Sequence, residues 1–350
     1  MGGSAKGGHL GFCETYDVRT RADEATVTTV TLPYPGTTRN RQAAWVSGNE
    51  LFLFGGNNSL GQHDFEPQHF CREAFKLHLG TLQFREVQDF PHNRQSMMPA
   101  MVADGSGSVV TIGGFGHDGE VARAHHQVHS YASDEDAWHV AMELPKPRTQ
   151  AGIVSRKDGI WIFGGVDYDP RREESFQYPT EVVHLDPSSG KVSAAEFETT
   201  QPRRAFGSCT LEGKTYLVGG MGPEFSLVAE PEVFDWTRQE WSTIEAPARP
   251  RISPHLVTMN TRLYLIGGSS PKQEGRGFES NRSVEVYDPF TRDWRVLVEQ
   301  LPFDTRHAQV EVVGDHILIF STHNDSGLMH LHYLDPGARE RATSRPAVSF

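Results

Sequence analysis

Apolar runs that end in two glycines recur along the chain at a nearly constant interval. Five copies are present: Leu51–Gly56, Val109–Gly114, Ile160–Gly165, Thr215–Gly220 and Leu263–Gly268. Their second glycines are 58, 51, 55 and 48 residues apart, and a sixth run ends 54 residues later with Ser321 and Thr322 in place of the glycines. Each run is apolar at nearly every position, as expected of a strand that is covered on both faces. The pattern therefore predicts six repeats, each containing a buried strand.

Two further features follow the same period. An aromatic or apolar residue precedes a second one by seven positions in the pairs Tyr131/Trp138, Phe234/Trp241, Tyr287/Trp294, Leu77/Phe84 and Leu185/Val192. An arginine precedes the second glycine by seventeen positions at Arg39, Arg148, Arg203 and Arg251, whereas Arg94 precedes Gly114 by twenty and Arg306 precedes Thr322 by sixteen. Three independent signals thus agree on the repeat.

Paired glycines, a tyrosine and a tryptophan, with an arginine upstream, resemble the kelch repeat, and the resemblance extends from Arg39 to about Asp335. It implies an all-β fold, a six-bladed β-propeller of four-stranded blades. For the fifth repeat we expect strands at 253–259, 262–268, 282–288 and 293–299. One such sheet cannot bury two apolar faces alone, but blades arranged around an axis cover each other.

The expected layout places the blades at about 39–90, 94–144, 148–199, 203–246, 251–300 and 306–336, within a single domain over 24–338. The β-branched segment 25–33 is expected to form the outer strand of the sixth blade and close the ring. Residues 1–23 are expected to be a flexible leader or cloning scar, and 339–350 a C-terminal tail. Tyr16–Thr20 is similar to Tyr287–Thr291, so an alternative is that the leader supplies more of the last blade.

Composition and charge limit the classes of partner that we expect for this protein. The formal net charge is −12, which argues against a nucleic-acid partner because phosphate binding requires a basic stripe. No segment reaches the ~20 apolar residues needed to span a bilayer. The three cysteines form no CxxC pair, so we expect reduced thiols. The N-terminus has no apolar segment of a signal peptide, so we expect a cytoplasmic protein. We also expect the protein to be monomeric. Because the sequence contains no BTB or F-box segment, we do not expect a ubiquitin-ligase adaptor.

The loops after the second strands are long, and we expect them to share one face with the arginine-bearing turns. Function in such folds usually lies on loops of this kind. The candidate ligand-binding residues form an expected ring of arginines at the channel mouth: Arg39 or Arg41, Arg94, Arg148, Arg203 or Arg204, Arg251 and Arg306. Guanidinium groups bind carboxylates and phosphates. The alternative is that these arginines only bond loop carbonyls of the neighbouring blade.

Histidines and acids share the same loops. Candidate metal ligands are His63, His69, His117, His125, His126 and His323, which together with loop carboxylates could hold Fe²⁺ or Zn²⁺. No local ligand spacing is present, and neither the Glu-x₃-Asp-x₃-His pattern of nitrile-specifier proteins nor the Tyr-His pair of galactose oxidase-type enzymes occurs. We therefore expect that the protein requires no cofactor. The alternative to a metal site is that these histidines and carboxylates are ordinary loop residues in contact with solvent.

Three functions remain open at this point. The first is a binding module for an anionic or polar ligand, such as an acidic peptide or a sugar acid, at the mouth. The second is an enzyme similar to the sialic-acid mutarotases, stand-alone kelch propellers in which a Glu and an Arg exchange a proton with the anomeric hydroxyl; candidates are Glu66, Glu224 and Glu279. The third is a metal-dependent enzyme that uses the loop histidines.

Overall fold

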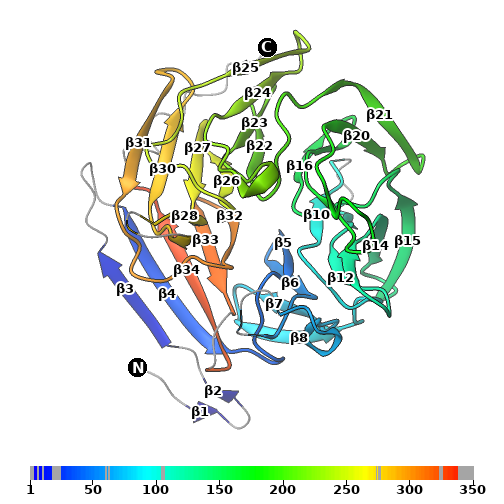
Figure 1. Cartoon of the computed structure of the whole chain (residues 1–350). Coiled ribbons are helices and arrows are strands. Elements are labelled where there is room, and N and C mark those ends of the chain that lie inside the picture. Colours follow the sequence, from blue (N-terminus) through cyan, green and yellow to red (C-terminus); the bar gives the residue numbers. More distant parts are fainter. Residues whose placement is uncertain are drawn as a thin grey trace.

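The computed structural model describes residues 4–5, 8–9, 12–17, 25–59, 61, 64–103, 107–272, 274, 277–322 and 326–337. Their regular structure consists of β-strands and two short 3₁₀ turns, η1 (Pro67–His69) and η2 (Pro223–Phe225). Six antiparallel sheets of four or five strands surround one axis (Figure 1). The prediction of an all-β, six-bladed propeller is therefore confirmed.

The first five blades have the same strand order, with the innermost strand first. Blade 1 contains β5 (Ala43–Ser47), β6 (Glu50–Phe54), β7 (Ala74–His78) and β8 (Gln83–Val87). Blade 2 contains β10 (Met98–Met101), β11 (Val109–Ile112), β14 (Gln127–Ala132) and β15 (Ala137–Glu143). Blade 3 contains β16 (Gly152–Arg156), β17 (Gly159–Phe163), β20 (Glu181–Asp186) and β21 (Lys191–Glu198). Blade 4 contains β22 (Gly207–Leu211), β23 (Lys214–Val218), β24 (Glu232–Asp235) and β25 (Glu240–Thr243). Blade 5 contains β26 (His255–Met259), β27 (Arg262–Ile266), β30 (Val284–Asp288) and β31 (Asp293–Val298).

Blade 6 joins the two ends of the chain. Its strands β32 (Gln309–Val313), β33 (His316–Ser321) and β34 (Leu328–Asp335) are continued by β4 (Thr26–Pro33), which pairs with β34 along its whole length. The predicted closing strand is thus confirmed. A fifth strand, β3 (Phe12–Asp17), pairs with β4, so the alternative in which the leader adds to the last blade describes the structure. A hairpin of β1 (Ser4–Ala5) and β2 (Gly8–His9) precedes it.

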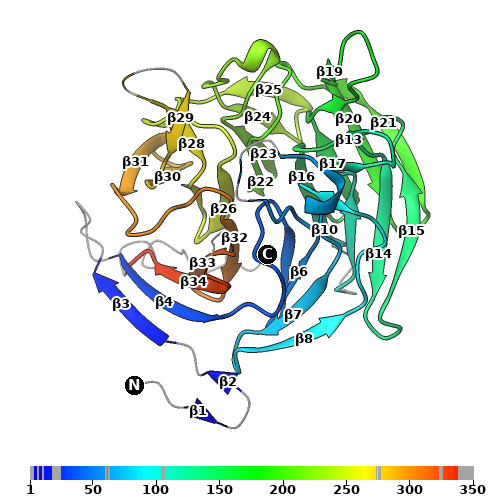
Figure 2. The ribbon, with the colours of Figure 1, turned by 60° about the horizontal axis from the view of Figure 1, so that its bottom comes forward.

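The inner strands form a closed ring. Contacts link β5 to β10, β10 to β16, β16 to β22, β22 to β26 and β26 to β32, and β32 in turn contacts β5. Figure 2 shows the six blades around the axis from a second direction. The axis is therefore surrounded by six inner strands that come from distant parts of the sequence.

The seven-residue interval corresponds to a cross-strand pair in each outer hairpin. Tyr131 lies opposite Trp138, Phe234 opposite Trp241 and Tyr287 opposite Trp294. The indole of Trp138 donates to the Gln88 carbonyl of blade 1 at 2.9 Å, and Trp294 donates to the Glu245 carbonyl of blade 4 at 2.8 Å. Trp138 and Trp294 therefore join blades 2 and 5 to blades 1 and 4, while their rings add aromatic contacts.

The glycine pairs allow adjacent blades to approach closely. Gly113 has φ +58°, and a Cβ built on it would lie 2.1 Å from the carbonyl oxygen of Arg148 in the next blade. The amide of Gly114 donates to the same oxygen at 3.1 Å. In blade 6 the hydroxyl of Thr322 donates to the Arg39 carbonyl at 3.0 Å, which replaces part of the contact that the missing glycines would make.

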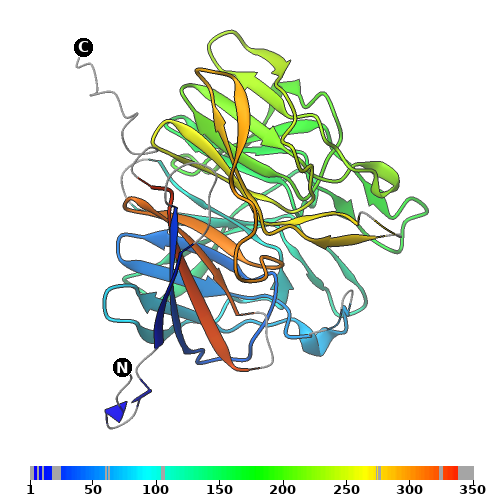
Figure 3. The same ribbon diagram turned by 90° about the vertical axis from the view of Figure 1, so that its left-hand side faces the viewer.

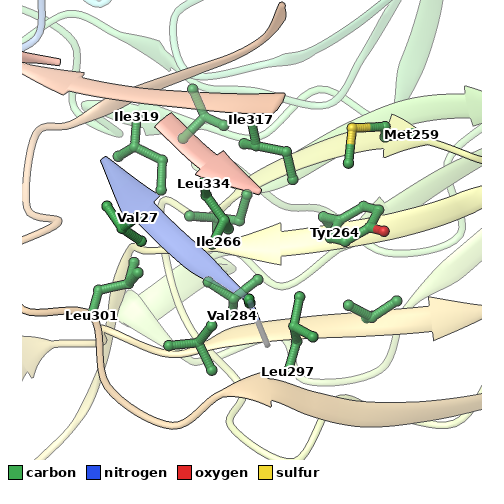
Figure 4. Packing of buried hydrophobic residues seen from close by; sticks show 14 of the residues in the cluster. Val27, Met259, Tyr264, Ile266, Val284, Leu297, Leu301, Ile317, Ile319 and Leu334 are labelled. Carbon is green, nitrogen blue, oxygen red and sulfur yellow. The ribbon is translucent and has the colours of Figure 1, made fainter. Parts of the chain in front are cut away.

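Apolar side chains fill the spaces between blades. The cluster between blades 5 and 6 includes Val27, Tyr264, Ile266, Ile319 and Leu334, each fully buried (Figure 4). Because Val27 comes from the N-terminal strand, the closure of the ring contributes directly to this core.

The long loops carry short strands of their own and extend from one end of the propeller (Figure 3). They contain β12 (Phe115–His117) with β13 (Ala122–Ala124), β18 (Asp167–Tyr168) with β19 (Phe176–Gln177), and β28 (Ser269–Pro271) with β29 (Phe278–Ser280). β9 (Arg94–Gln95) pairs with β12, and Arg204 forms an isolated bridge with Met221. The arginine-bearing turns and the long loops are thus at the same end, as predicted.

Candidate functional site

Five of the candidate arginines lie inside the blades. Their side chains are almost completely buried, with exposures of 0–3% for Arg39, Arg94, Arg148, Arg203 and Arg251. In each, Nη1 donates to the carbonyl of the first glycine of its own blade, for example Arg203 to Gly219 at 3.1 Å and Arg148 to Gly164 at 3.2 Å. This placement corrects the expectation that they line the channel mouth. They are structural groups that satisfy backbone carbonyls, as in the alternative, but these carbonyls belong to their own blade and not to the neighbouring one.

A carboxylate neutralises four of these five buried guanidinium groups. Arg39 pairs with Glu73, Arg203 with Glu232 at 2.7 Å, and Arg251 with Glu285. The carboxylate of Glu181 lies 3.9 Å from Arg148. Arg94 of blade 2 instead donates to the amide oxygen of Gln127 at 2.7 Å. A buried charge is tolerated when it is paired in this way, because desolvation of an unpaired ion is expensive.

Blade 6 departs from the repeat. Thr305, which is buried, occupies the position of the arginine, and its hydroxyl donates to the Asn281 carbonyl at 2.7 Å. Arg306 is the next residue, and its guanidinium is hydrogen-bonded to Asp304 at 2.5 and 2.8 Å. These bonds raise the pKa of Arg306. Its charge is thus already compensated.

The turns that enter the inner strands form a ring around the channel mouth. We define the mouth ring as the residue of each turn that has a left-handed backbone: Arg41, Ser96, Gln150, Ala205, Ser253 and His307, with φ between 50° and 58°. The Ser96 amide donates to the Arg41 carbonyl, Ala205 to Gln150 and Ser253 to Ala205, at 2.7–2.8 Å. Because the conformation recurs in every blade, it belongs to the fold, and the side chains on it determine what the mouth can bind.

Two arginines at the mouth have no carboxylate partner among the described residues. Arg41 is half-buried and makes no side-chain hydrogen bond or ion pair there, and burial lowers its pKa. Arg204 donates to Oε1 of Gln150 at 2.6 Å, and its guanidinium carbon lies 5.9 Å from the ring centre of Phe176 and 5.7 Å from that of Phe225. From the sequence, Arg41 and Arg204 were the alternatives to Arg39 and Arg203 in their turns. In the structure Arg39 and Arg203 are paired with carboxylates, whereas Arg41 and Arg204 are not.

Aromatic side chains of the long loops contact each other beside Arg204. The row runs from Phe65 through Phe115, Tyr168 and Phe176 to Phe225, with ring centres 4.7–5.8 Å apart. Phe225 is 57% exposed and follows Glu224, and both residues have left-handed backbone. Non-glycine residues in this conformation are strained, and such strain is concentrated at functional sites. None of these five aromatic residues was among the candidate site residues expected from the sequence.

The three candidate glutamates lie on the long loops. Glu66 precedes η1, Glu224 lies in η2 and Glu279 lies in β29, and each is exposed to solvent. Among the described residues, none of the three is hydrogen-bonded or ion-paired to Arg41, Arg204 or another arginine, so no such contact favours one of them as a catalytic acid.

The candidate metal ligands are dispersed. His69 contacts Asp64 at 3.2 Å and Asn58 at 2.9 Å, His125 is buried against the Gly116 carbonyl, and His126 lies 3.7 Å from Glu143. Nδ1 of His117 accepts from the Gly119 amide at 3.1 Å. His63 and His323 lie outside the described residues. Within the described part of the chain, no three histidine, cysteine or acidic side chains come together as a metal site would require.

A titratable group that the sequence analysis missed lies on the innermost strand of blade 6. Glu311 of β32 is half-buried, pairs across the sheet with Leu318, and has no side-chain hydrogen bond in the described chain. Desolvation raises its pKa from 4.5 to about 7. A charged residue in the apolar stretch Val310-Glu311-Val312 was the signal that could have identified it. By contrast, burial raises the pKa of Cys209 on β22 and makes that thiol a poor nucleophile.

A separate groove of about 580 Å³ lies at the rim of blade 3. Lys146, Tyr178 and the carboxylates of Asp167, Glu181 and Glu198 contribute to its lining. With three acids and one lysine, it disfavours an anion. It is distinct from the mouth ring.

Comparison with known proteins supports the fold. The chain is similar to beta-scruin of Limulus polyphemus, with 29% identity over 249 residues that cover 66% of this chain and 25% of that protein. It is also similar to the F-box/kelch-repeat protein SKIP20 of Arabidopsis thaliana, with 28% identity over 53% of this chain and 46% of that protein. Kelch-like protein 25 of Xenopus tropicalis shows 25% identity over 49% of this chain and 26% of that protein. The aligned region thus spans less than half the length of these relatives.

Among solved structures, that of YjhT matches with a TM-score of 0.70 and 13% sequence identity, covering 85% of this chain and 94% of that one. No protein-family model matches the chain. In the described part of the chain, we find no helix with the length and apolar character of a membrane span.

Proposed function

The chain is a kelch-repeat β-propeller, and from this premise we propose that it binds a small carboxylate-bearing ligand, a sugar acid or an acidic peptide side chain, at the mouth ring. The observation that carries the proposal is the pair of guanidinium groups, Arg41 and Arg204, that lack a carboxylate partner among the described residues in a chain of formal net charge −12. Of the other six candidate arginines of the turns, five have a carboxylate partner and Arg94 is buried against the Gln127 amide. Arg41 and Arg204, which have no carboxylate partner in the described chain, remain for a ligand.

The surroundings of the two arginines support an anionic ligand. Gln150 and the rings of Phe176 and Phe225 hold Arg204 in place, so little side-chain entropy is lost when it binds. Partial burial of Arg41 reduces screening by solvent and strengthens its attraction to a carboxylate. The exposed face of Phe225 offers an apolar surface for the ring of a sugar acid next to the cation.

The proposal is tested by calorimetric titration with glucuronate, galacturonate, N-acetylneuraminate and a glutamate-rich peptide. Arg41→Ala and Arg204→Ala should each weaken the binding of the active compound about 10- to 100-fold, because a hydrogen bond to a charged group contributes roughly 1.5–3 kcal/mol. Arg238→Ala, which removes one exposed positive charge from the β24–β25 turn, is the matched control and should bind normally. The proposal is wrong if no compound binds, or if the double variant binds as the unchanged protein does.

A second candidate function is proton exchange at the anomeric hydroxyl of a bound sugar acid, in the manner of the mutarotase-like alternative. Glu311 favours it, since a carboxyl with a pKa of about 7 can both donate and accept a proton near neutral pH. Glu311→Gln should abolish any acceleration of anomer exchange seen by NMR while ligand affinity is retained. Exchange at an unchanged rate would exclude Glu311 from this role.

A further inference from the structure

Blade 2 differs from the other blades at the buried arginine. Blades 1, 3, 4 and 5 place Glu73, Glu181, Glu232 and Glu285 beside it, whereas blade 2 places Gln127 beside Arg94. Nη1 of Arg94 donates to the Gly113 carbonyl at 3.3 Å, and its Nε has no partner among the described residues, as is also the case for Arg148 and Arg203. Desolvation lowers the pKa of Arg94 to about 9, and no acid opposes the shift. Among the five buried arginines, this guanidinium therefore lacks a counter-charge.

Two more polar groups without partners lie in the same region. His129 is 1% exposed, and neither of its ring nitrogens has a hydrogen-bond partner in the described part of the chain. The hydroxyl of Thr111 is buried and likewise unpaired there. Thr111 and His129 are directly opposite each other on β11 and β14. His129 follows Gln127 by two residues, so both side chains leave the same face of β14. Buried donors without partners are rare in native proteins.

In blades 4 and 5, the position equivalent to His129 is occupied by a glutamate. The residue opposite Leu217 in blade 4 is Glu232, and the residue opposite Leu265 in blade 5 is Glu285. Each of these glutamates pairs with the buried arginine of its own blade. Thr111 and His129 occupy the same two positions in blade 2. A side chain at the position of His129 is therefore within reach of the guanidinium, and two blades fill that position with negative charge.

Histidine rings around Arg94 remain neutral. The pKa of His129 is lowered to about 3 and that of His92 to about 4, first by burial and then by the charge of Arg94. The ring of His92 lies 5.1 Å from that of His129 and is partly exposed. Neutral histidine and threonine can each donate one hydrogen bond. They supply donors to an anion without adding charge.

We propose that a small inorganic anion, such as chloride, binds inside blade 2 between Arg94, Thr111 and His129. It takes the place that a glutamate carboxylate has in blades 4 and 5. The anion neutralises the guanidinium, accepts from Nε of Arg94, the Thr111 hydroxyl and a His129 N–H, and stabilises the strand β9 that begins at Arg94.

Thermal unfolding in sodium chloride and in sodium gluconate at the same ionic strength tests this site. Above saturation, each tenfold rise in chloride should increase the Tm by about 2–4 °C, because the anion binds the folded chain only. Gln127→Glu keeps the shape of the side chain and restores the counter-charge of the other blades, so this variant should lose the chloride-specific increase. An equal response of the variant and the unchanged protein would refute the proposal.

A crystal soaked in sodium bromide provides a second measurement that does not depend on a variant. An anomalous peak between Arg94 and His129 is the expected result, and it should be absent from crystals of the Gln127→Glu protein. A bromide-free site in the unchanged protein, occupied only by water, would overturn the proposal even if chloride raised the Tm.

Discussion

Arg251 and Glu285 form an ion pair in which both side chains are completely buried. Arg251 also donates to the carbonyls of Gly267 and Ser283, at 3.4 and 3.3 Å, and thereby joins the end of β27 to the start of β30. The Glu285 carboxylate in turn accepts from the Ala248 amide at 2.7 Å, which fixes the segment that leads into the same turn. The pair is thus the polar centre of blade 5.

Arg251→Met should lower the free energy of unfolding by about 3–5 kcal/mol, because it leaves the Glu285 carboxylate buried without a counter-charge. Urea denaturation measures the change. The matched control is Arg249→Ala, which breaks the exposed pair between Arg249 and Glu299 and should change stability by about 1 kcal/mol or less. Equal effects of the two substitutions would show that burial of the Arg251 pair does not matter.

Gly113→Ala should destabilise the protein by roughly 3 kcal/mol or more, since the left-handed backbone disfavours alanine and the new Cβ would collide with the Arg148 carbonyl. Gly190 also has a left-handed backbone, φ +68°, but has no atom within 4 Å of a built Cβ. Gly190→Ala should therefore lose only about 1–2 kcal/mol. Thermal melts of both variants separate the clash from the backbone preference, and similar losses would contradict the close approach of blades 2 and 3.

Glu311 should make stability fall as the pH rises. Its folded-state pKa of about 7 exceeds the unfolded value of 4.5, so the folded chain holds the proton more tightly. Stability is then complete below pH 4.5 and falls by roughly 2–3 kcal/mol as the pH increases to above 7. Urea titrations at pH 5 and pH 8 measure this difference. In Glu311→Gln the fall should be smaller by that amount, and an unchanged difference would show that the carboxyl is solvated.

The closure of the ring should depend on the inward face of β4. Val27 is fully buried between blades 5 and 6, whereas Thr28 is partly exposed. Val27→Thr places an unpaired hydroxyl in that core and should destabilise the protein by about 1–3 kcal/mol. Thr28→Val is the control and should have little effect. Limited proteolysis of both variants will show whether blade 6 opens first, and equal resistance would argue against closure through β4.

The sequence by itself determined the fold. Blade number follows from the recurring glycine pairs, the outer hairpins follow from intervals such as Tyr287 to Trp294, and the closing strand follows from the β-branched segment before Pro33. These features are local, because each depends on strand period, turn chemistry and the repeated burial of one sheet against the next. Residues 12–17 were the part left open, and their pairing with β4 is a choice between distant segments.

Only the tertiary structure decided which polar residues are available to a ligand. Arg39 and Arg41 are two residues apart and look alike in sequence, yet one is enclosed by Glu73 and the Gly55 carbonyl while the other has no polar partner among the described residues. The difference arises because the partners of Arg39, Gly55 and Glu73, lie 16 and 34 residues away in the sequence. A spacing rule contains no information on which distant groups a guanidinium will meet. For the same reason Arg94, beside Gln127, is unlike its counterparts only once the blades are assembled.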